Sequence, residues 1–257
     1  MNKDCPYCET KCQDITCPCP KYLAYVDVQD PNKVKQILDD LHFDTSLPDW
    51  DLMYSMQRSF EQRFHKIDNL TKEEMDNWIN KYIVCIEDEV REVRECLNLY
   101  NNRCDIKPEE LKKEVIDILH FMMDLFIAGG ATAQDIARLY SEKYHVNSDN
   151  IITTAYAFQS KYIYEYLNIY SVDKLDWGIL KATCKLLDAC AQVRQQISWK
   201  HWKKPNSDIN IDKLFHAYVL VFHEFINLCI LTMTVEEIKT IYVKKNVENI
   251  QRQKYGY

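Results

Sequence analysis

Four carboxylates are the residues of this sequence with the clearest chemical potential. Glu89 and Glu92 are three positions apart, and so are Glu114 and Asp117. Residues at this spacing lie on one face of an α-helix, so each pair presents two carboxylates side by side. Two such helices facing each other would form a cage of hard oxygen donors, the ligands that Mg²⁺ prefers. The four residues therefore predict a magnesium site for a phosphate-bearing substrate.

The two carboxylate pairs differ in their surroundings. Glu114 and Asp117 lie within an otherwise apolar stretch, where an ionised carboxylate is costly to bury without a partner. This favours a functional role for the second pair. The first pair has a simpler alternative, because the nearby Arg91 and Arg94 offer surface salt bridges.

Composition narrows the class of protein. The chain has 257 residues, of which 28% are charged, and a net charge of −7. This acidity argues against nucleic-acid binding as the main activity. The longest apolar candidate, residues 218–231, is interrupted by polar residues, so we expect no membrane span. The N-terminus lacks an apolar signal core, which predicts an intracellular protein, cytoplasmic or nuclear.

Helical patterns dominate most of the chain. Only four glycines and seven prolines punctuate it, which favours long helices over many strands. A capping box at Thr71–Glu74 opens one long helix, and Pro108 starts the next. His120 and His223 fall on apolar faces and are expected to be core histidines. We therefore expect an all-α fold, a bundle of long helices.

The sequence also contains a weak internal repeat. Residues 117–127 are similar to residues 220–230. The similarity predicts a duplicated unit, with halves at about 49–148 and 149–257. Chance similarity between amphipathic helices is the alternative.

Cysteines are concentrated near the N-terminus. Five of the eleven fall within the first nineteen residues, and two of them have the spacing of a zinc half-site, but no clean second pair follows. A zinc loop and a flexible thiol-rich tail both stay open for residues 1–22. The candidate zinc ligands are Cys5, Cys8, Cys17 and Cys19. Residues 23–48 are expected to form a linker with a short helix, ahead of a domain at 49–257.

The ordered set of motifs resembles a known family. The two carboxylate pairs resemble the metal-binding signature of the all-α NTP pyrophosphatases, and three further segments are similar to elements of the dimeric dUTPases and the related bacteriophage dCTPase/dUTPase. These segments are residues 114–121, 199–203 and 245–257. The resemblance covers residues 50–257. It implies a homodimer that hydrolyses dUTP, dCTP or both to a dNMP and pyrophosphate, with Mg²⁺ or Mn²⁺ as cofactor.

The resemblance also implies a role for each matched residue. Glu89, Glu92, Glu114 and Asp117 would bind metal, and Glu92, with Glu89 beside it, would serve catalysis by orienting the attacking water. Basic, aromatic and amide residues would hold the substrate. These are Trp199, Lys200, Trp202, Lys203, Lys245, Asn249, Arg252 and Tyr255.

Two departures from the family pattern matter. The segment 199–203 follows both carboxylate pairs, whereas in the family it lies between them, so the site would be composite, with metals from one half and phosphate ligands from the other. In the base-recognition helix, Gln57 matches the family, but Glu61 stands where an amide is usual. A carboxylate only accepts hydrogen bonds, which favours a base with an exocyclic amine. A pyrophosphatase for a purine or modified dNTP, and a non-catalytic helical scaffold, are the alternatives.

Overall fold

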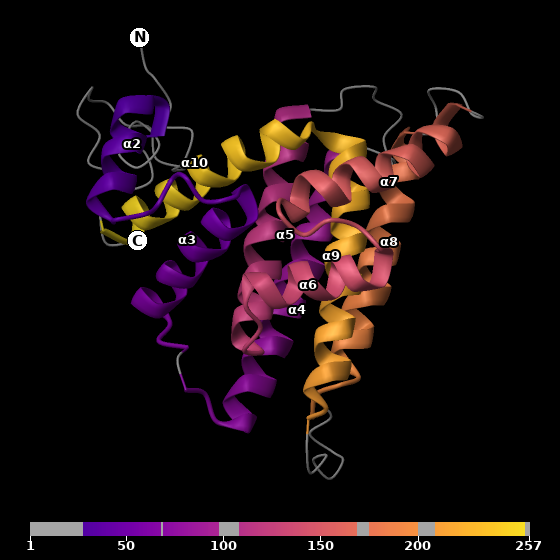
Figure 1. Cartoon of the computed structure of the whole chain (residues 1–257), viewed down its shortest axis with the longest axis horizontal. Helices are drawn as coiled ribbons and strands as arrows, with labels where there is room; N and C mark the ends of the chain where they lie inside the picture. Colours follow the sequence, from indigo (N-terminus) through magenta and orange to yellow (C-terminus); the bar gives the residue numbers. More distant parts are fainter. Residues whose placement is uncertain (1–27, 68, 98–107, 169–174, 200–208, 255–257) are drawn as a thin grey trace. The chain divides into compact units, whose positions relative to one another are not determined.

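The structure, a computed structural model, describes residues 28–67, 69–97, 108–168, 175–199 and 209–254. Over these ranges it is built from helices without a strand (Figure 1), which confirms the all-α prediction. The helices are α2 (Pro31–Asp40), α3 (Asp49–Phe64), α4 (Lys72–Cys96), α5 (Pro108–Ala128), α6 (Ala133–Tyr144), α7 (Ile151–Asn168), α8 (Leu175–Arg194), α9 (Ile211–Thr232) and α10 (Val235–Lys254).

The chain forms two compact units. The larger unit comprises residues 48–239, and the smaller unit comprises residues 1–47 and 240–257. In the smaller unit, α2 begins at Pro31 and is capped by Asp30, whose side chain accepts a hydrogen bond from the Asn32 amide at 2.9 Å. The domain boundaries inferred from the sequence, at residues 22 and 48, stay predictions.

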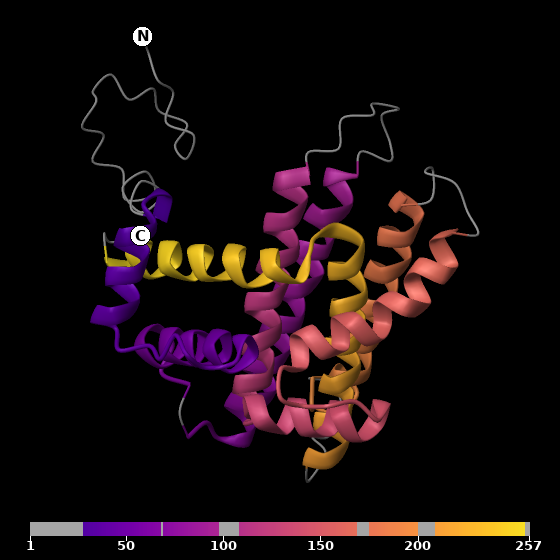
Figure 2. The same ribbon diagram turned by 45° about the horizontal axis from the view of Figure 1, so that its top comes forward.

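Four long helices form the centre of the larger unit. α4 packs along α5 and α8 packs along α9, and the two pairs meet through contacts of α4 with α8 and of α5 with α9 (Figures 1 and 2). Their inward faces carry apolar side chains at helical spacing, and these are almost completely buried. Burial of such a face, rather than helix propensity alone, stabilises helices of this length.

α9 is apolar enough to raise the question of a membrane span. Its most apolar window has a mean hydropathy of 1.7, but 61% of that window is buried within the protein. The helix contacts α5, α6, α7 and α8. It is therefore a central helix of the larger unit, packed on four neighbouring helices.

The turn between α5 and α6 directs the chain across the bundle. The two helices meet at 99°, and Gly130 adopts a φ of +80°, a left-handed value that glycine reaches without a steric penalty. Trp50 and Tyr54 of α3 hold this corner, because Trp50 Nε1 donates to the Ala133 carbonyl at 3.0 Å and the Tyr54 hydroxyl donates to the Ala131 carbonyl at 2.7 Å.

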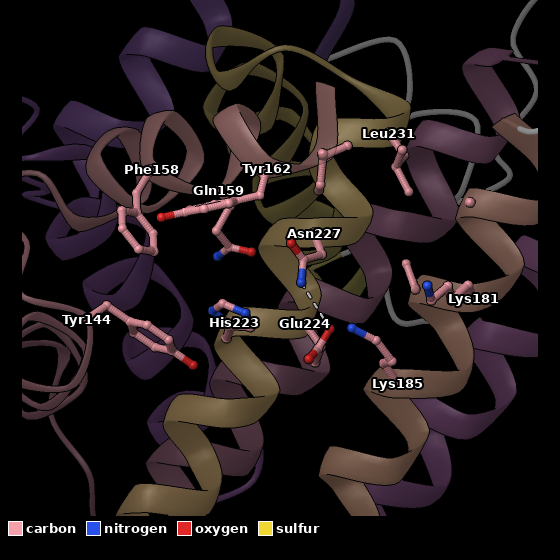
Figure 3. Close-up of a pocket in the computed structure, with 13 residues that line it drawn as sticks. Tyr144, Phe158, Gln159, Tyr162, Lys181, Lys185, His223, Glu224, Asn227 and Leu231 are labelled. Atoms are coloured by element: carbon pink, nitrogen blue, oxygen red, sulfur yellow. Dashed lines mark hydrogen bonds between the residues drawn. The ribbon is translucent and has the colours of Figure 1, made fainter. Parts of the chain in front are cut away.

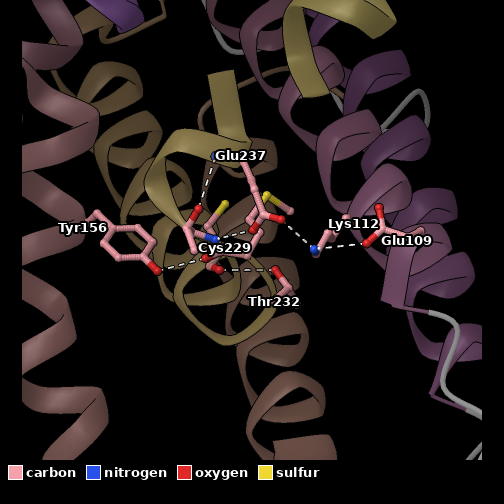
Figure 4. A network of polar contacts seen from close by, with 8 residues as sticks. Glu109, Lys112, Tyr156, Cys229, Thr232 and Glu237 are labelled. Carbon is pink, nitrogen blue, oxygen red and sulfur yellow. Dashed lines mark hydrogen bonds and ion pairs between the residues drawn. The ribbon is translucent and has the colours of Figure 1, made fainter. Parts of the chain in front are cut away.

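A similar corner recurs in the second part of the larger unit. The Tyr156 hydroxyl of α7 donates to the Met233 carbonyl at 2.9 Å, at the turn between α9 and α10. Tyr156 and Met233 lie 102 residues after Tyr54 and Ala131. Lys112 ties this second corner to α5, since its Nζ lies 3.2 Å from Glu109 and 2.7 Å from Glu237 (Figure 4).

The capping of the helices after the two corners is also alike. The Thr132 amide donates to the Asp135 carboxylate at 3.0 Å, and the Thr234 amide donates to the Glu237 carboxylate at 2.8 Å. These recurring contacts are those expected of two related halves. A common origin by duplication stays a prediction.

Candidate active site

Three of the four predicted metal ligands lie together between α4 and α5. Glu89 comes from α4, and Glu114 and Asp117 come from consecutive turns of α5. One carboxylate oxygen of each lies within 4.8 Å of the other two, and all three side chains are partly buried. The i, i+3 spacing on α5 and the antiparallel packing of α4 along α5 produce this convergence.

Glu92 does not belong to this cluster. Its side chain is 40% exposed, and its Oε1 lies 3.3 Å from Arg91 Nη2. The same guanidinium contacts Asp88 at 3.0 Å and Glu95 at 2.5 Å. The two residues of the first pair thus have different environments: Glu92 joins a surface ion-pair network, while Glu89 points to α5. The roles of Glu92 in metal binding and catalysis stay predictions.

A second group of polar residues lies further along α5. Gln57 of α3 donates from its Nε2 to Asp124 Oδ1 at 2.6 Å, and its Oε1 lies 2.8 Å from His120 Nδ1. The exposed fraction of each of these side chains is 5% or less. Since the amide oxygen can only accept, the proton of this contact is on His120 Nδ1. The two bonds fix the orientation of the Gln57 amide.

Glu61 extends the same group and is completely buried. Its Oε2 accepts a hydrogen bond from the Tyr82 hydroxyl at 2.5 Å, and its Oε1 lies 2.8 Å from His65 Nδ1. Glu61 also forms a hydrogen bond with the carboxyl of Asp124. A direct contact of Glu61 with a base stays a prediction, and such a contact would require these internal bonds to be exchanged.

The electrostatics of the buried pair favour one shared proton. Burial, and then the charge of Glu61, raise the pKa of Asp124 well above its ordinary value. Two carboxyls in hydrogen-bond contact cannot both ionise at low cost. The raised pKa favours the protonated form of Asp124, whose hydroxyl can donate to Glu61. This part of the site therefore combines the Gln57 amide with a carboxyl pair that shares one proton.

Aromatic residues of α4 border the polar group. The Trp78 ring stacks on Tyr82 with centroids 5.5 Å apart, and the ammonium of Lys81 lies 4.1 Å from the Trp78 ring. One turn before Glu89, burial raises the pKa of the Cys85 thiol. Cys85 is therefore a neutral thiol rather than a nucleophile.

Asp124 and Tyr82 are members of this group that the sequence patterns did not indicate. Both could have been found, because Asp124 continues the α5 stripe of Glu114, Asp117 and His120 at spacings of three and four. Tyr82 gave no signal of its own, since a tyrosine at helical spacing is ordinarily a core residue. The expectation that His120 is a core histidine is confirmed by its burial, and its bond to Gln57 places it in this group as well.

The remaining predicted substrate ligands come from other parts of the chain. Trp199 is partly buried, and its ring lies 5.7 Å from the Arg194 guanidinium carbon. Lys245, Asn249 and Arg252 lie on α10 in the smaller unit, where Arg252 pairs with Glu248. The other predictions concern positions outside the described residues: Lys200, Trp202, Lys203, Tyr255 and the cysteines 5, 8, 17 and 19. Their roles stay predictions.

The arrangement along α5 has two chemically different ends. Asp117 and Asp124 are seven residues apart on a continuous helix, which corresponds to roughly 10 Å along its axis. The cluster of Glu89, Glu114 and Asp117 can bind a hard cation, while the group around Gln57 and Asp124 can hydrogen-bond an uncharged polar ring. A molecule with a phosphate at one end and a base at the other fits this order.

Comparison with known families decides between the classes of protein that this site allows. The model of the dUTPase family matches residues 49–183, which is more than half of the chain. The chain belongs to the dUTPase family. This membership makes it, in general terms, a dUTPase-like nucleotide pyrophosphatase and implies a nucleotide substrate.

The matched range of this dUTPase-family chain contains both ends of the site. It includes α3, with Gln57 and Glu61, and the carboxylates of α4 and α5, and it ends within α8, before Trp199. A search of the curated proteins gives no match, and neither does a search of the solved structures.

Proposed function

We propose that the chain hydrolyses dUTP, dCTP or both between the α and β phosphorus atoms, in the presence of Mg²⁺, and releases a dNMP and pyrophosphate. The convergence of Glu89, Glu114 and Asp117 from two helices supports this proposal. Family membership supplies the class of reaction.

The three carboxylates fit a magnesium site by their chemistry. Mg²⁺ binds oxygen ligands and is held in phosphate-processing sites by one or two carboxylates together with the phosphates. Oxygens within 4.8 Å of one another can bind a common cation. A bound Mg²⁺ would neutralise the phosphoryl oxygens and activate water for in-line attack. Glu89, Glu114 and Asp117 would hold it, and Glu92 would accept the proton of the attacking water.

The base would lie towards Gln57 and Asp124. With its proton retained, Asp124 carries no charge that would repel a nucleotide, and its bond to Gln57 holds the amide in one orientation. An oriented amide offers one donor and one acceptor, which matches the edge of a pyrimidine. Discrimination between uracil and cytosine would depend on whether the base replaces Asp124 or His120 as the hydrogen-bond partner of Gln57.

The phosphate ligands of the proposed site are basic residues from later in the chain. Lys200, Lys203, Lys245 and Arg252 would neutralise the β and γ phosphates, since ammonium and guanidinium groups form strong charge-assisted bonds with phosphate. With the carboxylates from the first half, they would make the site composite.

Pyrophosphate release from each of the common dNTPs and dUTP, measured with Mg²⁺, tests the proposal. The decisive variant is Glu114→Gln, which keeps the size and removes the charge. Glu110→Gln is the matched control, because Glu110 is an exposed residue on the same helix. We expect turnover of dUTP or dCTP that falls by about 100-fold or more in Glu114→Gln, the upper end of the effect of perturbing a metal site, and is unchanged in the control.

Other results would redirect the proposal. Preference for dATP or another amine-bearing purine would support the alternative specificity and implicate Glu61. Absence of turnover with every nucleotide, in a chain that retains its helical circular dichroism, would contradict the enzymatic proposal and favour a scaffold. Equal loss in Glu114→Gln and Glu110→Gln would contradict the metal assignment.

A further inference from the structure

A cavity of about 440 Å³ lies in the second part of the larger unit, away from the carboxylate cluster (Figure 3). It opens between α7, α8 and α9. Aromatic rings from Tyr144, Phe158 and Tyr162 form one side of it, and Leu231 and Gly178 contribute to the other. The cavity is large enough for a small organic ligand with a flat ring.

Buried polar groups line the inner part of this cavity. Gln159 is 2% exposed, and its Nε2 donates to the Tyr140 hydroxyl at 2.8 Å. Its Oε1 is buried and has no hydrogen-bond partner among the described residues. A buried acceptor without a partner is costly. Figure 3 shows the Gln159 amide directed towards His223 within the cavity, where a ligand could donate to the free oxygen.

An aromatic surface continues beside the amide. The Tyr144 ring stacks on the His223 ring with centroids 4.6 Å apart and planes within 10°. Burial lowers the pKa of His223, so the imidazole is neutral at physiological pH. The inner part of the cavity therefore combines stacking surfaces with uncharged hydrogen-bonding groups.

The outer part of the cavity is positively charged. Lys181 and Lys185 of α8 are exposed lining residues, and Glu224 is the one carboxylate among the described residues that line the cavity. Figure 3 shows Lys185 extending from α8 towards Glu224. The Glu224 carboxylate accepts a hydrogen bond from the Asn227 amide at 3.0 Å. Two ammonium groups against one carboxylate leave an excess of positive charge, which favours an anionic ligand.

A second cavity, of about 550 Å³, follows along α9 towards its N-terminus. Lys143, Lys213 and two glutamines line it, and Asp212 is the one carboxylate among the described residues of its lining. Ala217 and Leu220 also line it, and the internal repeat aligns these two residues with the metal ligands of α5. Basic and amide groups therefore surround the positions that correspond in sequence to the acidic cluster of the first half.

The polar residues of the first cavity stand at corresponding positions to the polar group of the first half. Each lies 102 or 103 residues further along the chain: Gln159 after Gln57, His223 after His120 and Asn227 after Asp124. The carbonyl contacts of Tyr54 and Tyr156 show the same shift in the tertiary structure. The order of Ala217, Leu220, His223 and Asn227 along α9 therefore corresponds in sequence to the order of Glu114, Asp117, His120 and Asp124 along α5.

We propose that the cavity between α7, α8 and α9 is a second nucleotide site, which binds a nucleoside phosphate without a metal ion and does not hydrolyse it. The base would lie against Tyr144 and Phe158 and donate to Gln159. The phosphates would extend along α9 towards Lys181, Lys185 and Lys143. Because the described residues that line these cavities contain no counterpart of the acidic cluster, lysines would replace metal as the source of positive charge. The choice of a nucleotide as the ligand rests on the proposed function.

Equilibrium binding of the non-hydrolysable α,β-imido analogue of dUTP to the full chain tests this site. Titrations are run in EDTA, which removes metal-dependent binding, and again in Mg²⁺. The test variant is Lys181→Gln/Lys185→Gln, two exposed positions whose change leaves the core intact. Lys161→Gln is the matched control, since Lys161 is an exposed lysine of α7 outside the cavity lining. Glu114→Gln/Asp117→Asn reports on the carboxylate cluster.

We expect one equivalent of the analogue to bind in EDTA and two in Mg²⁺. Binding in EDTA should weaken by about tenfold or more in the double lysine variant, as expected for the loss of charge-assisted bonds. It should be unchanged in Lys161→Gln and in the carboxylate variant. The added equivalent in Mg²⁺ should disappear in the carboxylate variant.

Absence of binding in EDTA, or binding there that ignores the two lysines or requires Glu114 and Asp117, would overturn the second site. None of these results would touch the proposed catalytic function, which is judged by pyrophosphate release. If the chain does not turn over any nucleotide but still binds the analogue in EDTA, the proposed catalytic function would be contradicted and the second site would stand. A Gln159→Leu variant adds a check at the base end, where weaker binding with unchanged helical content is expected.

Discussion

At the scale of single residues, the pair formed by Glu61 and Asp124 is the most unusual feature of the larger unit. Both carboxyls are almost completely buried, and they are bonded to each other as well as to Tyr82 and Gln57. Burial of two acids is tolerated when they share one proton and when each remaining oxygen has a partner. The pair therefore makes stability depend on pH.

The sign of that dependence follows from the raised pKa of Asp124. The folded chain retains a proton that the unfolded chain loses above its ordinary value of 3.8. Its contribution to stability is complete below that value and is lost as pH rises through the higher folded value. Asp124→Asn keeps a donor towards Glu61 and an acceptor for Gln57 but cannot ionise. Urea unfolding from pH 5 to 8 should show the variant gaining stability relative to the wild type as pH rises. A difference that is constant over this range would contradict the shared proton.

Glu89 and Glu92 allow the metal role to be separated from the proton-transfer role. Glu89 points into the cluster and Glu92 into the surface network. Glu92→Gln should lower kcat by a factor on the order of 100 or more, the usual contribution of a general base, with Mg²⁺ affinity unchanged by calorimetry. Glu89→Gln should weaken Mg²⁺ binding itself. Glu95→Gln, a change of another exposed partner of Arg91 on the same helix, should leave both quantities unchanged. Reduced Mg²⁺ affinity in Glu92→Gln would instead make Glu92 a ligand.

At the scale of elements, the packing of α5 against α9 positions the carboxylates. The closest approach is at Gly129, directly after α5, where a Cβ atom would lie 2.1 Å from the Tyr218 hydroxyl. Tyr218 is fully buried and its ring contacts Phe126 with centroids 4.8 Å apart. It therefore has little freedom to move away.

Two glycine substitutions test this packing. Gly129→Ala should lower the free energy of unfolding by about 1–3 kcal/mol, the usual cost of overpacking a core. Gly178→Ala is the contrasting change within α8, where the nearest atom would lie at an ordinary 3.5 Å. It should be neutral or stabilise the chain by about 0.5–1 kcal/mol, since alanine has the higher helix propensity. Chemical denaturation of both variants measures the difference, and equal effects would show that α5 and α9 separate easily.

At the scale of the whole molecule, the proposed metal site would link Mg²⁺ binding to folding. One carboxylate oxygen of each of the three acidic residues lies within 4.8 Å of the others, so a cation bound among them would reduce their mutual repulsion. Mg²⁺ at about 100 times its dissociation constant should therefore stabilise the folded chain by about 2.7 kcal/mol. The melting temperature should rise with Mg²⁺ in the wild type and return on addition of EDTA. Glu114→Gln should show a much smaller rise, whereas an equal rise would place the bound ion elsewhere.

The cysteine-rich N-terminal segment can be separated from catalysis at the same scale. All matched family positions lie at residues 49–183, so deletion of residues 1–22 should leave pyrophosphate release within about twofold, an effect below 1.4 kcal/mol. Zinc per chain, measured before and after the deletion, distinguishes a zinc loop from a thiol-rich tail. One equivalent that disappears with the segment indicates the loop. A large loss of turnover would show that the segment contributes to the site.

The local features of this protein can be predicted from its amino-acid sequence. The spacing of apolar residues, the scarcity of glycine and proline, and the capping box at Thr71 were sufficient for an all-α fold, because helix formation depends on residues within a few positions of one another. The same spacing placed Glu114 and Asp117 on one face, and the order of motifs was sufficient for the family.

Which residues far apart in the sequence come into contact depends on how the helices pack in the tertiary structure. Glu89 and Glu92 have similar sequence neighbours, yet packing of α4 on α5 brings one to the carboxylate cluster and leaves the other with Arg91. Likewise, Glu61 is bonded to Asp124 and Tyr82 because α3, α4 and α5 meet at that point. Periodicity specifies the face of a helix, but the rotation of that face towards a particular partner is set by the packing of the whole core.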